Sequence, residues 1–327
     1  MAGQGKRMRP HTLMTPKPLI PVGGKPIVQR LLEDIAAMCD EPIYEIGFII
    51  GDFGDVVEKE LLDIASSLGA KGKIYYQDIA LGTGHAIYCA EPLLTGPVIV
   101  AFADTLFRAD FKIDPKQEGT IWVKQIEDPS QFGVVKVNEV GAITDFVEKP
   151  KDFVSDLAII GIYFFKDGDH LKRELKYLMD NNIVKGGEYQ LTDALENMKQ
   201  QGVVFRPGTV DHWMDCGNKN ATVETNRMIL EFEKDQNLVS SSAVIENSTL
   251  IQPVQIADGV RIENSVVGPH VSVGKNAVIK NARVSNSIVQ SDSSINNAVI
   301  ENSLIGMQTS IDLSALDLSM GDFSTMN

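Results

Sequence analysis

A repeat of short β-branched units between residues 243 and 311 restricts the fold more than any other feature of the chain. Apolar residues recur there six positions apart, with a step of five between runs, as in Leu250, Ile256, Ile262, Val267, Val273 and Ile279. Asn-Ser pairs and small residues fill the gaps. A period near six predicts a parallel β-helix of about four coils, in which every sixth residue points into a triangular prism. An antiparallel sandwich fits less well, because the strands are too short and too even.

Upstream of this repeat the chain alternates between two other patterns. Amphipathic stretches with helical spacing alternate with apolar runs typical of buried strands: 27–38, 45–51, 55–68, 73–77, 85–94 and 97–104. Several strand-like runs follow between residues 119 and 165, and helical stretches cover 168–180 and 190–201. The alternation predicts an α/β fold with a Rossmann-like mixed, mostly parallel sheet and helices on both faces. Ligands of such sheets bind beyond the carboxyl ends of the strands, where Gln77 and Asp104 fall.

Composition and charge exclude several classes of protein. The 327 residues carry a formal net charge of −14, which disfavours nucleic acid as a partner. The longest apolar run, residues 157–165, is too short to cross a bilayer, and the N-terminus lacks the apolar region of a secretory signal. Cys39, Cys89 and Cys216 are too far apart for a disulfide framework or a zinc knuckle. We therefore expect a cytoplasmic protein with no membrane partner and reduced cysteines.

Against this acidic background, the first thirty-two residues contain no acidic side chain. They carry six basic residues: Lys6, Arg7, Arg9, Lys17, Lys25 and Arg30. Gly3 and Gly5 lie in this segment, and a glycine loop can turn backbone N–H groups toward phosphate oxygens at close range. Five prolines between residues 10 and 26 restrict the backbone, which a merely solvated basic face would not need. The segment predicts a binding site for a polyphosphate.

Two familiar phosphate-binding motifs do not fit this segment. A dinucleotide-binding GxGxxG loop would need a glycine where Met8 stands and an acidic ribose ligand further on, but the region beyond is basic. No GxxxxGK[ST] loop can be drawn through the segment. A phosphate-binding glycine loop normally follows a strand, yet only Met1 and Ala2 precede Gly3. We expect a short apolar strand upstream of Met1 in the natural chain.

The segment AGQGKRMRP, followed by TPKPLIPVGGKPI, resembles the signature of sugar-1-phosphate nucleotidyltransferases. Gln4 and Lys6 stand where many members have Gly and Thr. The resemblance implies that Arg7 and Lys17 are catalytic and hold a nucleoside triphosphate, with Gly3 and Gly5 in the nucleotide site. Several members add a left-handed β-helix. The resemblance then implies a nucleotidyltransferase domain over residues 1–236, the β-helix over 240–311, and a C-terminal cap or tail over 312–327.

Four further segments extend the resemblance. QDIALGTGHAI resembles a pyrimidine-reading segment, which implies that Gln77 and Gly82 bind the base. Asp104 and the aspartate of VDHWMDCGN, Asp215, match metal ligands of the family, with Thr105 where Asn is usual. FVEKP implies that Glu148 binds sugar hydroxyls and Lys149 the 1-phosphate. The positions near the sugar that also match are Phe132, Gly133 and Gly161, whereas Asp156 stands where Asn is common.

Each of these residues also has a structural interpretation. Gly82 and Gly84 suit a turn at a helix start, and an Asp after a strand often caps or turns the chain. A Glu-Lys pair is usually a surface pair. A lone histidine such as His212 is more often structural than catalytic. The functional interpretation therefore requires that these side chains converge in the fold.

The sequence thus predicts an enzyme that transfers a nucleotidyl group from dTTP or UTP to a hexose 1-phosphate, with Mg²⁺ as cofactor. Glucose 1-phosphate is the expected sugar, and the β-helix is expected to join subunits into a homo-oligomer. The alternatives are a mannose-1-phosphate guanylyltransferase and a non-catalytic sensor of sugar nucleotides. An acyltransferase on the β-helix is a weaker alternative, because the sequence suggests no partner for His270.

Overall fold

The computed structural model describes residues 5–109 and 112–313, which form two compact units. The first unit contains Pro26–Gly217 together with the chain up to Ile20, and the second contains Pro21–Lys25 and the chain from Asn218 onward. Gly3 and residues 314–327 of the expected C-terminal cap lie outside the described part. The predicted domain limits stay predictions.

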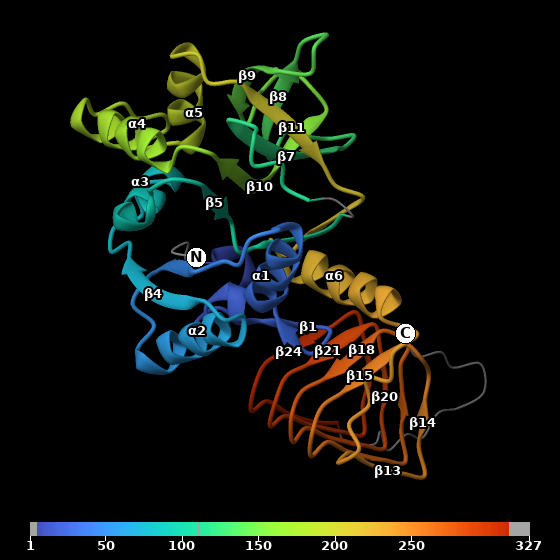
Figure 1. The fold of residues 1–327 in the computed structure, drawn as a ribbon. Helices are drawn as coiled ribbons and strands as arrows, with labels where there is room; N and C mark the ends of the chain where they lie inside the picture. The colour runs from blue at the N-terminus through green and yellow to red at the C-terminus, as the bar shows by residue number, and fades with distance from the viewer. Residues whose placement is uncertain (1–4, 110–111, 314–327) are drawn as a thin grey trace. The chain divides into compact units, whose positions relative to one another are not determined.

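The first half of the first unit begins with two short 3-10 turns, Lys6–Met8 and Lys17–Leu19. A βαβ arrangement follows them in the sequence (Figure 1). Its elements in order are α1 (Ile27–Met38), β3 (Glu45–Ile50), α2 (Asp55–Ser67), β4 (Lys71–Tyr76), α3 (Thr83–Cys89), the 3-10 turn Glu91–Leu93 and β5 (Val98–Ala101). β3 and β4 pair in parallel from Glu45 opposite Lys71 to Ile50 opposite Tyr76. The predicted order of strands and helices in this half is confirmed.

The second half is built on a sheet with β10 at its centre. Its elements are β6 (Thr105–Arg108), β7 (Gly119–Gln125), β8 (Gly133–Val137), β9 (Ile143–Glu148), β10 (Leu157–Phe165), α4 (Gly168–Asp180), α5 (Leu191–Gln200), β11 (Phe205–Thr209) and β12 (His212–Asp215). β10 is buried over almost its whole length, which explains the unbroken apolar run of residues 157–165. Side chains of α4 and α5, including Leu171, Leu175 and Leu195, share one core with those of β7 and β10.

The pairing in this sheet is mixed. β10 runs antiparallel to β5, β7 and β8, whereas β11 runs parallel to β7. The α/β class is confirmed. The short connection between β8 and β9 favours their antiparallel pairing, whereas the three neighbours of β10 are not adjacent to it in the sequence.

The second unit is a parallel β-solenoid with one helix, α6 (Lys219–Phe232), and the short strands β1 (Pro21–Val22) and β2 (Lys25–Pro26). Asn226 of α6 is fully buried, and its Oδ1 accepts from Gly23 N–H at 2.8 Å and from Ser272 Oγ at 2.6 Å. Within the described residues every helix is too short or too polar to span a lipid bilayer.

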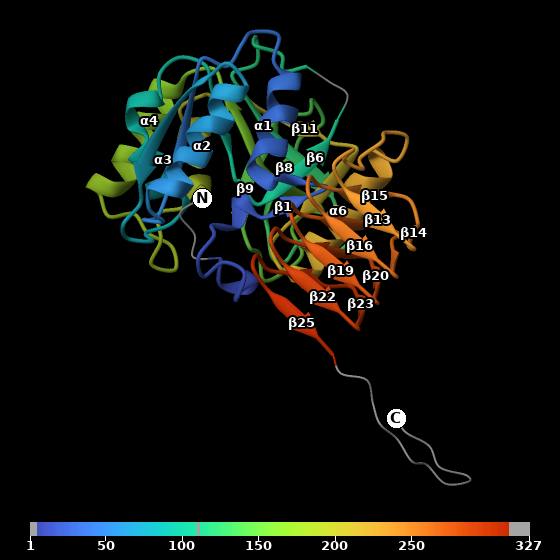
Figure 2. The same ribbon diagram turned by 90° about the horizontal axis from the view of Figure 1, so that it is seen from below.

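Three parallel sheets make the walls of the solenoid, and Figure 2 shows the strands of the first sheet coil by coil. The first sheet contains β13 (Val244–Glu246), β16 (Arg261–Glu263), β19 (Val278–Lys280), β22 (Ser294–Asn296) and β25 (Ser310–Asp312). The second contains β14 (Thr249–Leu250), β17 (Val266–Val267), β20 (Arg283–Ser285) and β23 (Val299–Glu301). The third contains β15 (Val254–Ile256), β18 (Val271–Val273), β21 (Ser287–Val289) and β24 (Leu304–Ile305).

The register explains the period of six. Leu250, Ile256 and Ile262 lie on three successive sheets, so a step of six residues turns the chain by one wall. Ile262 stacks on Ile279, the equivalent residue of the next coil. The predicted β-helix is confirmed, and its stacked apolar residues form a separate core.

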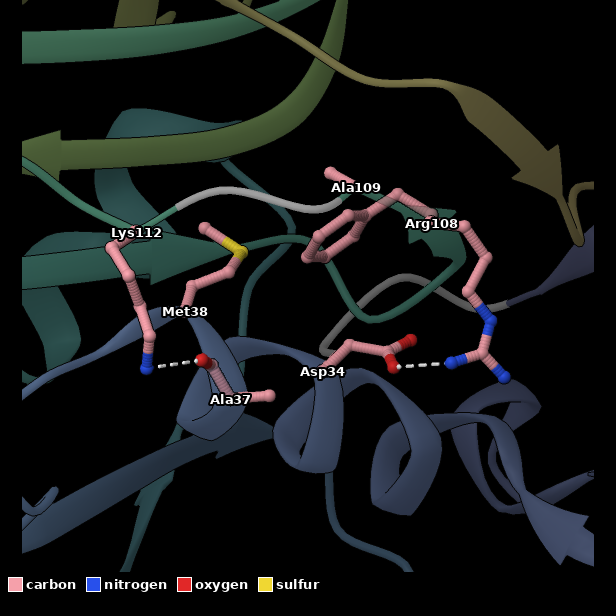
Figure 3. A pocket seen from close by; sticks show the side chains of 7 residues that line it. Asp34, Ala37, Met38, Arg108, Ala109 and Lys112 are labelled. Carbon is pink, nitrogen blue, oxygen red and sulfur yellow. Dashed lines mark hydrogen bonds and ion pairs between the residues drawn. The ribbon is translucent and has the colours of Figure 1, made fainter.

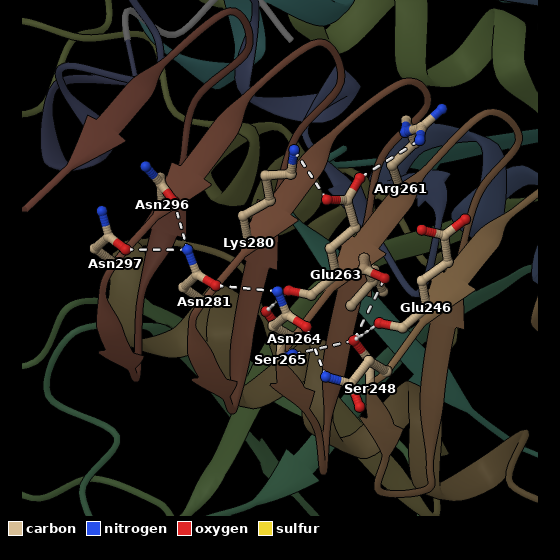
Figure 4. A network of polar contacts seen from close by, with 12 residues as sticks. Glu246, Ser248, Arg261, Glu263, Asn264, Ser265, Lys280, Asn281, Asn296 and Asn297 are labelled. Carbon is tan, nitrogen blue, oxygen red and sulfur yellow. Dashed lines mark hydrogen bonds and ion pairs between the residues drawn. The ribbon is translucent and has the colours of Figure 1, made fainter.

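Asn-Ser pairs, and Asn281 followed by Ala282, form corners of the coils (Figure 4). Asn247, Asn264 and Asn281 have φ of 47°, 49° and 47°, the left-handed region that Asn tolerates better than most residues. Asn247 Nδ2 donates to Asn264 Oδ1 at 2.7 Å, and Asn264 Nδ2 donates to Asn281 Oδ1 at 3.3 Å. Ser248 Oγ accepts from the N–H of Ser265 in the next coil at 3.0 Å. The corner residues therefore satisfy backbone groups that a turn would leave unpaired.

Candidate functional site

The strand pair β6 and β12 brings two predicted metal ligands together. Asp104 directly precedes β6, and Asp215 ends β12, where it pairs with Thr105. The N–H of Cys216 donates to the carbonyl oxygen of Asp104 at 3.0 Å, which joins the two backbones at this point. The two carboxylates are separated by more than a hundred residues in sequence but occupy neighbouring positions in the fold.

The charges around the two carboxylates differ. Lys17 Nζ donates to Asp104 Oδ2 at 2.7 Å, and the lysine side chain is only 12% exposed. Burial alone would raise the pKa of Asp104, but the charge and hydrogen bond of Lys17, together with a backbone hydrogen bond and other nearby charge, hold that pKa below its usual value. Burial and then the negative charge of Asp104 raise the pKa of Asp215. A bound cation would relieve this repulsion.

The chemistry of this pair fits a hard divalent cation. Carboxylate oxygens are the ligands that Mg²⁺ prefers, and Mg²⁺ commonly takes one or two carboxylates while phosphate and water oxygens fill the other positions. In the described part of the chain, no cluster of three or more His, Cys, Asp or Glu side chains could hold a metal by itself. Asp104 and Asp215 would supply two of the ligands of such an ion.

Gly5 and Arg7 are predicted site residues of the basic loop that lie in the described part of the chain. Gly5 has φ of 55°, and a Cβ there would lie 3.0 Å from Thr12 Cγ2, so the position favours glycine. The carbonyl oxygen of Gly5 accepts from Met8 N–H and from Thr12 Oγ1, each at 2.8 Å. Arg7 is exposed, and its positive charge lowers the pKa of Asp215, although less than Lys17 does. Arg7 and Lys17 thus both act electrostatically on the carboxylate pair.

Gln77 lies directly after β4 and is buried, at 8% exposure. Its Nε2 donates to the carbonyl oxygen of Gly82 at 3.0 Å and lies 3.0 Å from His85 Nδ1. Gly82 has φ of 102°, and a Cβ there would lie 2.6 Å from the carbonyl oxygen of Tyr189. Gly84 N–H donates to the same Tyr189 oxygen at 2.8 Å. The loop that carries the predicted base site is therefore held against the segment before α5.

The predicted sugar-phosphate residues lie at the end of β9. Glu148 pairs with Gly133 on β8, and a Cβ on Gly133 would lie 3.1 Å from Glu148 Oε2. Burial raises the pKa of Glu148, and this outweighs the opposite effect of the Lys149 ammonium. Lys149 has φ of 41°, an uncommon conformation for a non-glycine residue, and its side chain is 65% exposed. Its Nζ lies 3.8 Å from Glu148 Oε1, which leaves the ammonium accessible to a ligand.

Gly161 lies at the irregularity of β10, where the register with β7 shifts. Its φ is 84°, and its carbonyl oxygen accepts from Phe102 N–H at 2.8 Å. A Cβ there would lie 3.1 Å from the side chain of Phe102, two residues before Asp104. The structure thus places Gly161 beside the segment that carries Asp104.

Aromatic contacts join the sugar side to the carboxylate side. The rings of Phe132 and Trp213 pack edge to face with centroids 4.8 Å apart. Trp213 Nε1 donates to Thr105 Oγ1 at 2.6 Å. Thr105, which stands where Asn is usual, therefore holds the strand that carries Asp215. Asp156, the other departure from the family pattern, accepts from Gln125 Nε2 at 2.6 Å.

The segment between α4 and α5 contributes charged residues that the sequence analysis did not identify. Glu188 lies in this segment and Asp193 in the first turn of α5, and both raise the pKa of Glu148, after the effects of burial and Lys149. Asp193 is 8% exposed, its Oδ1 forms an ion pair with Lys185, and its buried Oδ2 has no hydrogen-bond partner within residues 5–109 and 112–313. The only sequence signal was the stretch VKGGEYQLTD, in which glycines and charges interrupt two helices.

A cavity of about 460 Å³ is lined by none of these residues but by residues of α1 and the end of β6, and Figure 3 shows its lining. Arg108 contacts Asp34 Oδ1 at 3.2 Å, and Lys112 Nζ donates to the carbonyl oxygen of Ala37 at 2.9 Å near the end of α1. Cations near a helix C-terminus satisfy its last carbonyls. Arg108 and Lys112 therefore link the cavity wall to α1.

Relatives with known names match most of the chain. The sequence is 30% identical over 325 residues to the low-salt glycan biosynthesis nucleotidyltransferase Agl11 of Haloferax volcanii, which covers 90% of this chain and 87% of that protein. It is 30% identical over 317 residues to a glucose-1-phosphate thymidylyltransferase of Streptomyces antibioticus, with 90% and 86% covered. It is 29% identical over 273 residues to the catalytic subunit beta of a mannose-1-phosphate guanylyltransferase of Drosophila melanogaster, with 80% and 70% covered.

The fold also matches a solved structure, a UDP-glucose pyrophosphorylase complexed with UDP-glucose. The TM-score is 0.58 at 24% identity, and the match covers 71% of this chain and 96% of that one. The sequence model of the nucleotidyl transferase family matches residues 1–231, most of the chain. The chain therefore belongs to the nucleotidyl transferase family, the group that its N-terminal signature resembles.

Proposed function

We propose that this protein transfers a nucleotidyl group from UTP or dTTP to a hexose 1-phosphate, with release of pyrophosphate. The observation that carries the proposal is the convergence of Asp104, Asp215 and the largely buried Lys17 beside an acid-free loop. Two anions must approach each other in this reaction, so a site of this kind needs positive charge at the reacting phosphates. Glucose 1-phosphate is the proposed acceptor because one relative is named a glucose-1-phosphate thymidylyltransferase.

The chemistry needs little from a general base. A sugar phosphate is largely a dianion at neutral pH, because its second pKa is about 6. It can attack the α-phosphorus directly, so catalysis consists of alignment and charge neutralisation. Lys149 would hold the attacking phosphate, while Arg7 and Lys17 would neutralise the triphosphate. Mg²⁺ held by Asp104 and Asp215 would supply further charge neutralisation at the phosphate oxygens.

We expect specificity constants for UTP or dTTP to exceed that for GTP at least about a hundredfold. Gln77 is buried at the predicted base site, and each polar group left unpaired there would cost about 1 to 3 kcal/mol. Guanine also carries a ring N–H, so the discrimination against GTP rests on its larger ring system and on the other polar groups of its edge. Burial of the thymine methyl would contribute only about 0.8 kcal/mol to binding, so we expect both UTP and dTTP to be substrates. Gln77→Ala should reduce selectivity more than it reduces turnover.

The test is a matrix of four nucleoside triphosphates against several sugar 1-phosphates, with pyrophosphate release as the readout. The proposal expects turnover with a pyrimidine nucleotide and a hexose 1-phosphate. Equal or better turnover with GTP would favour a mannose-1-phosphate guanylyltransferase, the function named for one relative. Binding of a sugar nucleotide without turnover in any combination would indicate a sensor.

We also propose that the outer face of the solenoid joins subunits into a homo-oligomer. Val299 on β23 is 80% exposed, and a shallow groove of about 560 Å³ that includes Val299, Val266 and Arg283 follows this face. Val299→Glu should lower the mass measured by light scattering, because a charge would be buried at the contact. Val56→Glu is the matched control, since Val56 on α2 is 81% exposed. An unchanged mass for Val299→Glu would contradict the proposal.

A further inference from the structure

The buried carboxamide of Gln77 has a second partner besides Gly82. His85 lies on α3, and its Nδ1 is 3.0 Å from Gln77 Nε2. Within residues 5–109 and 112–313, His85 Nδ1 has one further polar neighbour, Cys89 Sγ at 3.9 Å, at the outer limit for a contact to sulfur. Gln77 is therefore the closer partner of His85 Nδ1.

The contacts determine the orientation of the carboxamide. The carbonyl oxygen of Gly82 can only accept a hydrogen bond, so the amide nitrogen of Gln77 must face it. The second hydrogen of the same NH₂ group then points to His85 Nδ1, which must accept. This requires the tautomer that carries its proton on Nε2. Both donor hydrogens of Gln77 are thus used within the protein.

The consequence is that Gln77 presents only an acceptor to a ligand. No donor within residues 5–109 and 112–313 pairs with its Oε1. Uracil and thymine carry a ring N–H at N3 and guanine carries one at N1, whereas cytosine N3 and adenine N1 are bare acceptors. Oε1 opposite such an acceptor would leave two buried lone pairs facing each other without a proton.

We propose that His85 is a positioning residue that locks Gln77 with Oε1 toward the base, so that the site selects nucleotides with a ring N–H. The proposal rests on the proposed function only in placing Gln77 at the base. If His85 is removed, one of the two bonds that orient the carboxamide is lost. The amide can then rotate and offer Nε2 to the bare ring nitrogen of cytosine.

The experiment measures kcat/KM for two pairs of nucleotides of equal ring size, UTP against CTP and GTP against ATP. In the wild-type protein the member with a ring N–H should be preferred within the pair that the enzyme uses. His85→Ala should reduce that preference about tenfold, the effect of about one hydrogen bond, through a higher KM for the preferred nucleotide and a lower KM for the other. His85→Asn should restore most of it, because Asn Oδ1 can accept in place of Nδ1.

A matched control is available on α4, where His170 Nε2 lies 2.9 Å from Gln201 Oε1 in a similar histidine-glutamine contact. His170→Ala should leave both nucleotide ratios unchanged. An unchanged ratio in His85→Ala, or an Asn variant that behaves like the Ala variant, would overturn the proposal for His85. A wild type without preference within either pair would overturn it as well.

The results that would reject the proposed function differ from those that would reject the role of His85. Exclusive use of GTP would reject the pyrimidine substrate, while the GTP to ATP ratio would still test His85. If no nucleotide is turned over, the activity is rejected, and calorimetric affinities for UTP and CTP in the same three variants decide the role of His85. Equal affinities of the wild-type protein for UTP and CTP would overturn the proposed role of His85.

Discussion

Asp215→Asn is expected to reduce turnover by about a thousandfold or more, because it removes one of the two carboxylates that would hold Mg²⁺ at the reacting phosphates. The substitution keeps the size of the side chain, and its Oδ1 can still accept from Gly217 N–H, now at 3.0 Å. The local fold should therefore survive. Asp104→Asn should have a similar effect and would also remove the ion pair with Lys17.

Metal titration distinguishes this explanation from a general loss of structure. Both variants should require more Mg²⁺ for half-maximal turnover, and chelation should abolish turnover of the wild type. Asp211→Asn is the matched control, since Asp211 is an exposed aspartate four residues before Asp215. Full activity of the wild type in excess chelator would refute the metal site.

Arg7→Ala is expected to cost about two to three decades in turnover, equivalent to about 3 kcal/mol, by analogy with the loss of one donor to a developing oxyanion. Arg7 is exposed in the acid-free loop, and its charge already acts on Asp215. Arg7→Lys should recover little of this loss, because a point charge does not reproduce the planar two-pronged guanidinium.

The control for Arg7 is a neighbouring cation with the same exposure. Arg9 is exposed two residues further on in the same loop. Arg9→Ala should change kcat by no more than about threefold, whereas it removes the same formal charge. Near-normal turnover of Arg7→Ala in single-turnover experiments would reject its catalytic role.

Much of the architecture followed from local patterns. The period of six predicted the solenoid because each wall holds one inward residue per step, as Leu250, Ile256 and Ile262 show. Helical spacing predicted α1, in which Ile27, Leu31, Ile35 and Met38 are buried. Such periods are visible without knowledge of the partner, because burial of one face is a property of the element itself.

The mixed sheet was harder to predict. The strands between residues 119 and 165 are buried apolar runs whether they pair in parallel or antiparallel. The strand β10 takes three antiparallel neighbours, none of which directly precedes it in the sequence, so the local connections do not reveal their direction.

The sequence by itself determined the two kinds of fold, the solenoid and the α/β unit, and the identity of the motif residues. Only the tertiary structure decided which of these residues meet, as Asp104 and Asp215 do through the Cys216 hydrogen bond. It also revealed the contact between Gln77 and His85 and the effect of Asp193 on Glu148. The physical reason is that periodicity records how each element is buried, whereas hydrogen bonds and charge interactions depend on distances between segments remote in the chain.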